Sequence, residues 1–118
     1  LMIAYPKTDL VANNMHAIST NESSRFAIND FGIYEPEKGE EIAAGYFDII
    51  FVPLLAIDKK GYRVGYGKGY YDKFMFDCRE DCVRIGFSYF EPIQEMPDKH
   101  EFDVPLNLCI TPQSVYVF

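Results

Sequence analysis

The stretch Phe47-Asp-Ile-Ile-Phe-Val-Pro53, followed by Arg63-Val-Gly-Tyr-Gly-Lys-Gly-Tyr-Tyr-Asp72, contains the signals that decide the fold. Residues 49–52 form an unbroken apolar run ended by proline, which is typical of a strand covered on both faces. Beyond the last glycine, apolar residues recur at helical spacing and predict a helix that begins directly after the loop. These residues are Tyr70, Tyr71, Phe74, Met75 and Cys78. A buried strand, a glycine loop and a helix in this order indicate an α/β domain.

The loop has glycine at every second position, at Gly65, Gly67 and Gly69. Glycine allows a ligand to approach the backbone closely and allows positive φ. The free N–H groups of a helix start favour phosphate, and Arg63 and Lys68 add two cations. The spacing is not that of a Walker A loop, and the dinucleotide fingerprint is broken at its third glycine. From the residues alone, phosphate binding and a glycine–tyrosine turn without a ligand are equal alternatives.

Length and composition indicate a globular protein with one core. The chain has 118 residues, 48% of them hydrophobic and 16% aromatic. A net charge of −7 argues against nucleic acid or an anionic membrane surface as the main partner. The sequence has no apolar run of transmembrane length and no signal peptide. Cys78, Cys82 and Cys109 form no CxxC pair, so we expect reduced thiols in a cytoplasmic protein and no zinc site.

The remaining elements are predicted from shorter signals. Residues 1–5, closed by Pro6, have the pattern of a core strand, and residues 13–18 that of a short strand or a substrate-facing loop. His16 has no obvious Ser, Cys or Asp partner, which argues against a catalytic triad. We expect a short acidic helix over residues 37–45, with Gly45 just past its end. The other expected elements are loops at 19–25 and 90–100 and strands at 82–87, 103–112 and 115–118.

The residues from Val52 to Asp72 resemble the signature of the 5-formyltetrahydrofolate cyclo-ligase (methenyltetrahydrofolate synthetase) family. The resemblance comprises Val52-Pro53, Ala56-Ile57-Asp58, Gly61-Tyr62-Arg63 and Gly65-Tyr-Gly-Lys-Gly-Tyr-Tyr-Asp72. It implies one cyclo-ligase-type domain over residues 1–118. The implied fold is a three-layer, Rossmann-like α/β structure, in which helices cover both faces of a mostly parallel sheet. In the family, a preceding helical segment supplies ligands to nucleotide and folate, and we expect that segment to be missing here.

The resemblance implies ATP, Mg²⁺ and a folate as ligands, with Arg63 and Lys68 as the catalytic cations. The implied nucleotide contacts are Arg63, Gly65, Tyr66, Gly67, Lys68, Gly69, Tyr70 and Tyr71. The implied folate contacts are Met15, Tyr66, Gly67, Lys68, Gly69 and Tyr70. For Met15 an ordinary buried methionine is at least as good an interpretation, and for Tyr71 core packing is an equal one.

Two carboxylates are candidate ligands for the metal. Asp72 falls in the first turn of the predicted helix, where Mg²⁺ would bridge it to phosphate oxygens. The alternative is a first-turn acid that stabilises the helix by about 0.3–1 kcal/mol. The resemblance assigns Asp103 to the same metal, although Phe102 and Asn107 stand where the family often has histidine and aspartate. Glu35 is interpreted as helping to set the turn before the central strand.

The implied reaction converts 5-formyltetrahydrofolate to 5,10-methenyltetrahydrofolate, driven by ATP and Mg²⁺, in a monomer or weak dimer. Phosphorylation of the formyl oxygen makes it a good leaving group, and the neighbouring folate nitrogen then closes the ring. Such a transfer needs positioning and charge neutralisation rather than a nucleophilic serine or cysteine. Two alternatives remain. One is a non-catalytic nucleotide- or phosphate-binding module of the same fold, and the other is a protein-interaction domain whose glycine loop is structural.

Overall fold

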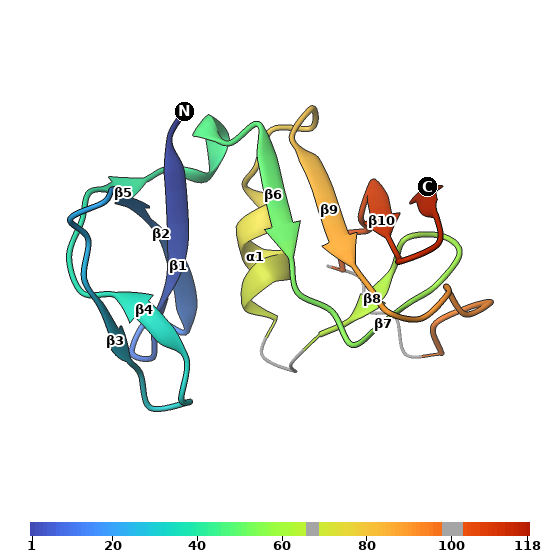
Figure 1. Cartoon of the computed structure of the whole chain (residues 1–118), viewed down its shortest axis with the longest axis horizontal. Coiled ribbons are helices and arrows are strands. Elements are labelled where there is room, and N and C mark those ends of the chain that lie inside the picture. The colour runs from blue at the N-terminus through green and yellow to red at the C-terminus, as the bar shows by residue number, and fades with distance from the viewer. Residues whose placement is uncertain (66–68, 98–102) are drawn as a thin grey trace.

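The computed structural model is an α/β structure with a mixed sheet and one α-helix among its described residues (Figure 1). The described residues are 1–65, 69–97 and 103–118. Strands β1–β5 lie on one side of the molecule, and strands β6–β11 with the helix lie on the other (Figure 1). Within the described ranges, no helix is long and apolar enough to span a membrane.

The larger sheet has four strands in the order β11-β10-β9-β6. Strands β6 (Ile49–Val52), β9 (Val83–Phe87) and β10 (Leu108–Ile110) are parallel neighbours, and β11 (Val115–Val117) adds an antiparallel edge. This confirms the α/β class, with a mixed sheet in which two of the three strand pairings are parallel. The strand predicted over residues 103–112 is shorter than expected, because residues 103–107 are not in a strand.

The other strands are antiparallel. Strands β1 (Ile3–Asp9), β2 (Asn14–Thr20) and β5 (Glu41–Ile42) form one sheet in that order. Strands β3 (Phe26–Ile28) and β4 (Tyr34–Pro36) form a hairpin that packs beside β1. A third pair is made by β7 (Ala56–Ile57) and β8 (Arg63–Val64).

The helix α1 (Tyr70–Phe76) packs against one face of the larger sheet (Figure 1). Its buried residue Met75 belongs to the core cluster with Val52, Leu106 and Cys109. Side chains alternate along β6, so Val52 faces this core and Phe51, which is 60% exposed, faces away. The prediction that β6 is covered on both faces is therefore wrong for the described residues, because no element there covers the second face.

The predicted acidic helix over residues 37–45 is wrong. The segment instead contains β5 and a single 3₁₀ turn, η1 (Ala44–Tyr46). The segment pairs with β2 in an antiparallel arrangement, and the Ser19 N–H donates to the Glu40 carbonyl at 2.8 Å. Gly39 lies close to β2, because a Cβ added to Gly39 would be 2.5 Å from Cγ2 of Ile18. Pairing with a strand distant in sequence overrides a weak local preference for helix.

The first strand is also longer and more exposed than predicted. Strand β1 continues through Pro6, which an edge strand tolerates because its outer backbone groups have no ladder partner. Leu1, Ile3 and Tyr5 are about half exposed or more, so residues 1–5 are not in the described core. Residues 13–18 lie mostly in β2, which confirms the strand alternative for that segment.

Candidate functional site

A cavity of about 1070 Å³ lies between β1, β2 and the β3–β4 hairpin on one side and β8 and the start of α1 on the other. All of the predicted site residues that the structure describes line it. They are Met15, Arg63, Gly65, Gly69, Tyr70, Tyr71, Asp72 and Asp103. Tertiary structure therefore brings together residues that are far apart in the sequence. The three remaining predicted residues, Tyr66, Gly67 and Lys68, lie outside the described residues.

Arg63 is the buried cation of this cavity. Its side chain is only 7% exposed, and its Nη2 lies 3.5 Å from Oδ1 of Asp72. Its Nε is buried and has no hydrogen-bond partner within the described part of the chain. A buried guanidinium with an unused donor is costly unless an anion or a polar ligand satisfies it, so its placement suits a phosphate-bearing ligand.

Two glycines shape the surroundings of Arg63 for different reasons. A Cβ at Gly65 would lie 2.5 Å from Nη1 of Arg63, so the absence of a side chain lets the guanidinium lie against the backbone. Gly69 has φ of +70° directly before α1, a conformation that residues with a Cβ rarely adopt, while the space around it is open. The helix has seven residues, so Arg63 is a stronger candidate for anion binding than the helix dipole.

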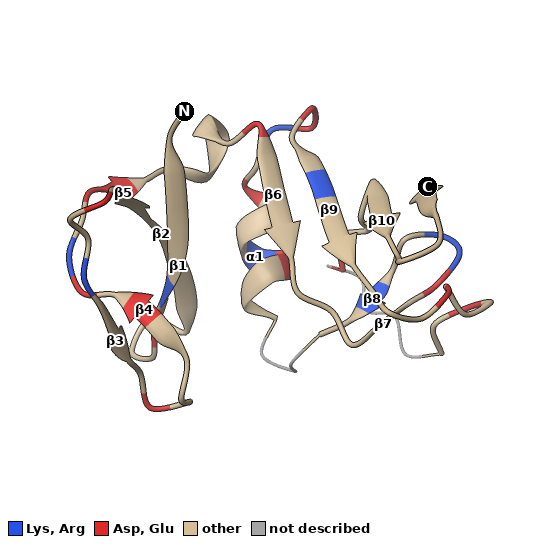
Figure 2. Cartoon of the chain, in the orientation of Figure 1, with Lys and Arg blue, Asp and Glu red and all other residues tan. Residues whose placement is uncertain are grey.

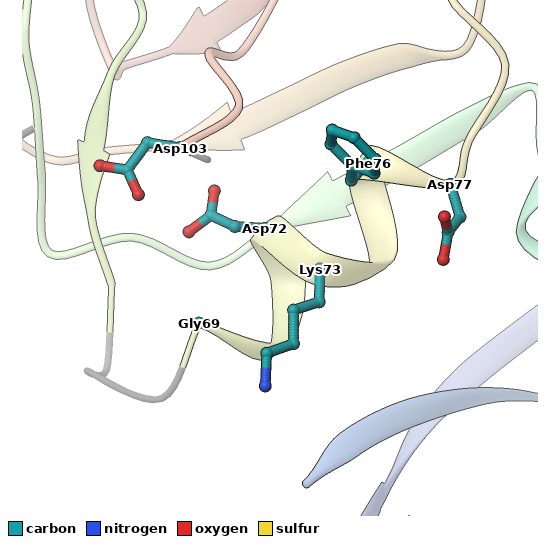
Figure 3. A pocket seen from close by; sticks show the side chains of 6 residues that line it. All are labelled: Gly69, Asp72, Lys73, Phe76, Asp77 and Asp103. Carbon is teal, nitrogen blue, oxygen red and sulfur yellow. The ribbon is translucent and has the colours of Figure 1, made fainter. Parts of the chain in front are cut away.

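Asp72 has two structural contacts besides its place at the cavity. Its Oδ1 accepts the Val104 N–H at 3.1 Å and also faces Arg63. Figure 3 shows the side chains of Asp72 and Asp103 on the same side of α1, one from the helix and one from the segment before β10. Both carboxylates also line a smaller cavity of about 420 Å³, together with Lys73.

The described residues contain no group of three or more His, Cys, Asp or Glu side chains that could hold a metal ion. This does not conflict with Mg²⁺, which is usually bound by one or two carboxylates together with water and substrate phosphates. Asp72 and Asp103, which line the same cavity, therefore fit such an ion.

The two tyrosines at the start of α1 differ in burial. Tyr71 packs against the core cluster, and burial raises the pKa of its hydroxyl above the ordinary value. It also lines the cavity, so core packing and ligand contact are compatible for this residue. Met15 lies on β2 opposite Thr8 of β1, and both line the cavity from the other side.

The sequence pattern did not reveal the contacts of three polar residues. Asp58 is fully buried: its Oδ1 accepts the N–H groups of Lys60 and Tyr62, and its Oδ2 accepts that of Met96. An aspartate followed by glycine three residues later is a turn signal that was available in the sequence. The bond to Met96 had no such signal, because the two residues are distant along the chain.

His16 is not the unpartnered histidine that the sequence suggested. Its Nδ1 contacts the Glu41 carboxylate, and its Nε2 lies 3.5 Å from Oδ2 of Asp9. The hydrogen bond with Glu41 is the main cause that raises the pKa of His16. Glu35 was expected to help set a turn, and it does anchor its hairpin: its Oε2 accepts the Thr8 N–H at 2.7 Å. It also lines the large cavity.

Comparisons of sequence and of structure with known proteins point to the same family. A model of the 5-formyltetrahydrofolate cyclo-ligase family matches residues 2–112. The 5-formyltetrahydrofolate cyclo-ligase of Haemophilus influenzae is 37% identical over 82 residues, a match that covers 66% of the chain. That of Mycoplasma genitalium is 32% identical over 74 residues and covers 62% of the chain. The structure of Aquifex aeolicus 5,10-methenyltetrahydrofolate synthetase superposes with a TM-score of 0.80 and 29% identity over 98% of the chain.

The matched regions are parts of longer proteins. They make up 43% and 45% of the two cyclo-ligases and 58% of the Aquifex aeolicus chain. The chain thus spans about half the length of these relatives, and the similarity extends over nearly all of its own length.

Proposed function

Because the chain belongs to the 5-formyltetrahydrofolate cyclo-ligase family, we propose that it carries the phosphate and metal part of an ATP-dependent 5-formyltetrahydrofolate cyclo-ligase site. The reaction would give 5,10-methenyltetrahydrofolate, ADP and phosphate. The observation that carries the proposal is the buried Arg63 guanidinium, with its unused Nε donor, in a cavity that also contains Asp72 and Asp103.

The chemistry of this reaction matches what the cavity offers. The formyl oxygen of a formamide leaves poorly, and phosphorylation by ATP makes it a phosphate leaving group for attack by the neighbouring folate nitrogen. The protein has to hold the reacting groups in line and neutralise phosphate charge. One cation about 4 Å from a phosphate contributes about 4 kcal/mol at an effective dielectric of about 20, before desolvation. Arg63 supplies such a charge, and we propose Lys68 as the second cation of the same loop.

We propose that Asp72 and Asp103 hold Mg²⁺ between them. Bound there, the ion would neutralise charge on the ATP phosphates and orient them. Asp72 has a second task, because its carboxylate also faces Arg63 and accepts the Val104 N–H. It thereby links the guanidinium to the segment that carries Asp103.

The loop residues Gly65, Tyr66, Gly67, Gly69 and Tyr70 are proposed to contact the nucleotide, and all but Gly65 are proposed to contact the folate as well. Tyr71 is proposed as a further nucleotide contact. Met15 is proposed to lie against the folate, which is supported by its place on the opposite wall of the cavity. A volume of about 1070 Å³ is slightly above the usual range for single-ligand pockets, which supports a site for two ligands.

The finer description of the fold is also a proposal. The half-exposed face of β6, with Phe51 against Phe87 at a ring distance of 5.6 Å, would be covered by a helical layer in a three-layer, Rossmann-like domain. Residues 1–118 would then form part of a single domain. We further propose a cytoplasmic enzyme, monomeric or weakly dimeric, that acts on small molecules and has neither nucleic acid nor membrane as partner. The net charge of −7 supports the absence of nucleic acid and anionic membrane as partners.

The direct test is turnover of 5-formyltetrahydrofolate with Mg·ATP by the purified full-length protein, followed by the near-ultraviolet absorbance of the methenyl product. One ADP should form for each product molecule. A well-folded protein that binds ATP but yields no product would instead be the non-catalytic module. Failure to bind ATP would leave a structural glycine loop.

A further inference from the structure

The β3–β4 hairpin forms a wall of the large cavity that the proposed phosphate site does not use. Four of its residues line the cavity, namely Asn29, Phe31, Ile33 and Glu35. The phosphate-site residues Arg63 and Asp72 line it from β8 and α1. In Figure 1 the hairpin and β8 lie on opposite sides of α1. The cavity therefore has two walls of different chemistry.

The hairpin tip has a defined shape. Oδ1 of Asn29 accepts the N–H groups of Phe31 and Ile33 at 2.8 and 3.0 Å, and Gly32 between them has φ of +77°. Phe31 and Ile33 are each more than half exposed although both line the cavity. A flat, largely apolar ligand would bury their exposed surface.

The base of the hairpin is fastened to β1 by side-chain hydrogen bonds. Lys7 Nζ donates to the carbonyls of Pro36 and Glu37 at 3.0 Å each, and Glu35 Oε2 accepts the Thr8 N–H at 2.7 Å. These bonds fix where the Glu35 carboxylate lies. Within the described residues, the Glu35 side chain accepts one hydrogen bond, from the Thr8 N–H to Oε2. Oε1 is therefore available to a ligand.

Only three carboxylates are recorded among the described residues that line the cavity, and two of them, Asp72 and Asp103, belong to the proposed metal site. Glu35 is the third, and it lies on the hairpin wall. Figure 2 shows the same separation, with an acidic segment on β4 and a basic one on β8. A carboxylate only accepts hydrogen bonds, so Glu35 selects ligand groups that carry N–H or O–H donors.

We propose that Glu35 is the specificity-determining residue for the ring end of the substrate, and this rests on the function proposed above. The pterin of 5-formyltetrahydrofolate presents two adjacent donors, the N3–H and the 2-amino group. The geometry points to acceptance of these donors by Glu35, while the ring lies against Phe31 and Ile33 and the formyl group faces the Arg63 side. Charge-assisted bonds of this kind are stronger than neutral ones and discriminate sharply against ligands that lack the donor.

The test compares Glu35→Gln with the unaltered protein, using two ligands: 5-formyltetrahydrofolate and the same compound without its 2-amino group. Glutamine keeps an oxygen for the Thr8 N–H but loses the charge. We expect Glu35→Gln to raise the KM for 5-formyltetrahydrofolate by about 10- to 100-fold, with little change in the KM for ATP or in the Tm. The preference of the unaltered protein for the 2-amino compound should shrink towards unity in the variant.

Glu37→Gln is the matched control, because Glu37 is an exposed neighbour on the same hairpin that does not line the cavity. It should leave both KM values unchanged. An unaltered preference for the 2-amino compound in Glu35→Gln would overturn the inference and leave Glu35 as a hairpin anchor. If the unaltered protein neither binds nor converts 5-formyltetrahydrofolate, the proposed function fails instead, so the two failures are distinguishable.

Discussion

The guanidinium of Arg63 and the carboxylate of Asp72 lie 3.5 Å apart and join β8 to the first turn of α1 in the cavity wall. The same Asp72 oxygen accepts the Val104 N–H and so holds the segment that carries Asp103. One carboxylate thus positions both the cation and the second acid of the proposed phosphate site. Asp72 is more than the first-turn acid that a helix pattern alone would suggest.

Asp72→Asn and Asp72→Ala should separate these roles. Asparagine keeps an oxygen for the Val104 N–H, so its Tm should change little, but Mg·ATP affinity should fall by about tenfold or more because the charge is lost. Alanine should lose the same affinity and, in addition, about 1–3 kcal/mol of unfolding free energy. Calorimetric titration and thermal unfolding measure the two effects. Equal Mg·ATP affinity in Asp72→Asn would remove Asp72 from the metal site, and Asp77→Asn, at the exposed C-cap of α1, serves as the control.

Gly65→Ala should displace Arg63 without a large loss of stability. A Cβ there would lie 2.5 Å from Nη1, and the long arginine side chain would move rather than the backbone. We expect ATP-dependent turnover to fall by about tenfold or more, since a small misplacement of a phosphate ligand is costly. Gly45→Ala is the matched control, because its added Cβ meets nothing within 4 Å. Equal turnover in the two variants would show that the position of Arg63 is unimportant.

Asp58→Ala should be strongly destabilising, because three backbone N–H groups would lose their shared acceptor in a fully buried site. We expect a loss of about 2–4 kcal/mol in urea unfolding. Asp30→Ala, at an exposed hairpin position, should stay within about 0.5 kcal/mol of the unaltered protein. A similar small effect for both variants would contradict the structural role of Asp58.

His16 should titrate above its ordinary pKa of 6.5, chiefly through its hydrogen bond to Glu41 and also through Asp9. A pKa raised by folding means that this contribution to stability is fully present below about pH 6.5 and is lost as the pH rises through the folded-state pKa. NMR titration of the imidazole measures the shift directly. Lys7 is the cross-strand neighbour of His16, but its ammonium is bound to carbonyls of the hairpin.

Glu41→Gln should move the pKa of His16 back towards 6.5 and flatten the dependence of unfolding free energy on pH above that value. The natural comparison is Glu40→Gln, since Glu40 is an exposed neighbour for which no side-chain contact with His16 is recorded in the described structure. A His16 pKa that is the same in Glu41→Gln as in the unaltered protein would show that the contact does not persist in solution.

The sequence by itself determined the parts of this protein that depend on local pattern. The apolar run 49–52 became β6, the spacing after Gly69 became α1, and the alternation in 82–87 became β9. The glycines and charges from Arg63 to Asp72 also predicted a group of residues of which the described ones line the large cavity. These signals succeed because side-chain period and glycine conformation are properties of neighbouring residues.

The tertiary structure decided everything that depends on residues distant along the chain. It turned the acidic segment 37–45 into a partner of β2, because cross-strand hydrogen bonds outweigh weak helix propensity. It brought Met15 and Glu35 into the same cavity as Arg63, gave His16 its carboxylate partners, and placed Asp103 in the same cavity as Asp72. Such contacts leave no local signature, because they arise from packing between elements whose separation in sequence carries no information about their distance in space.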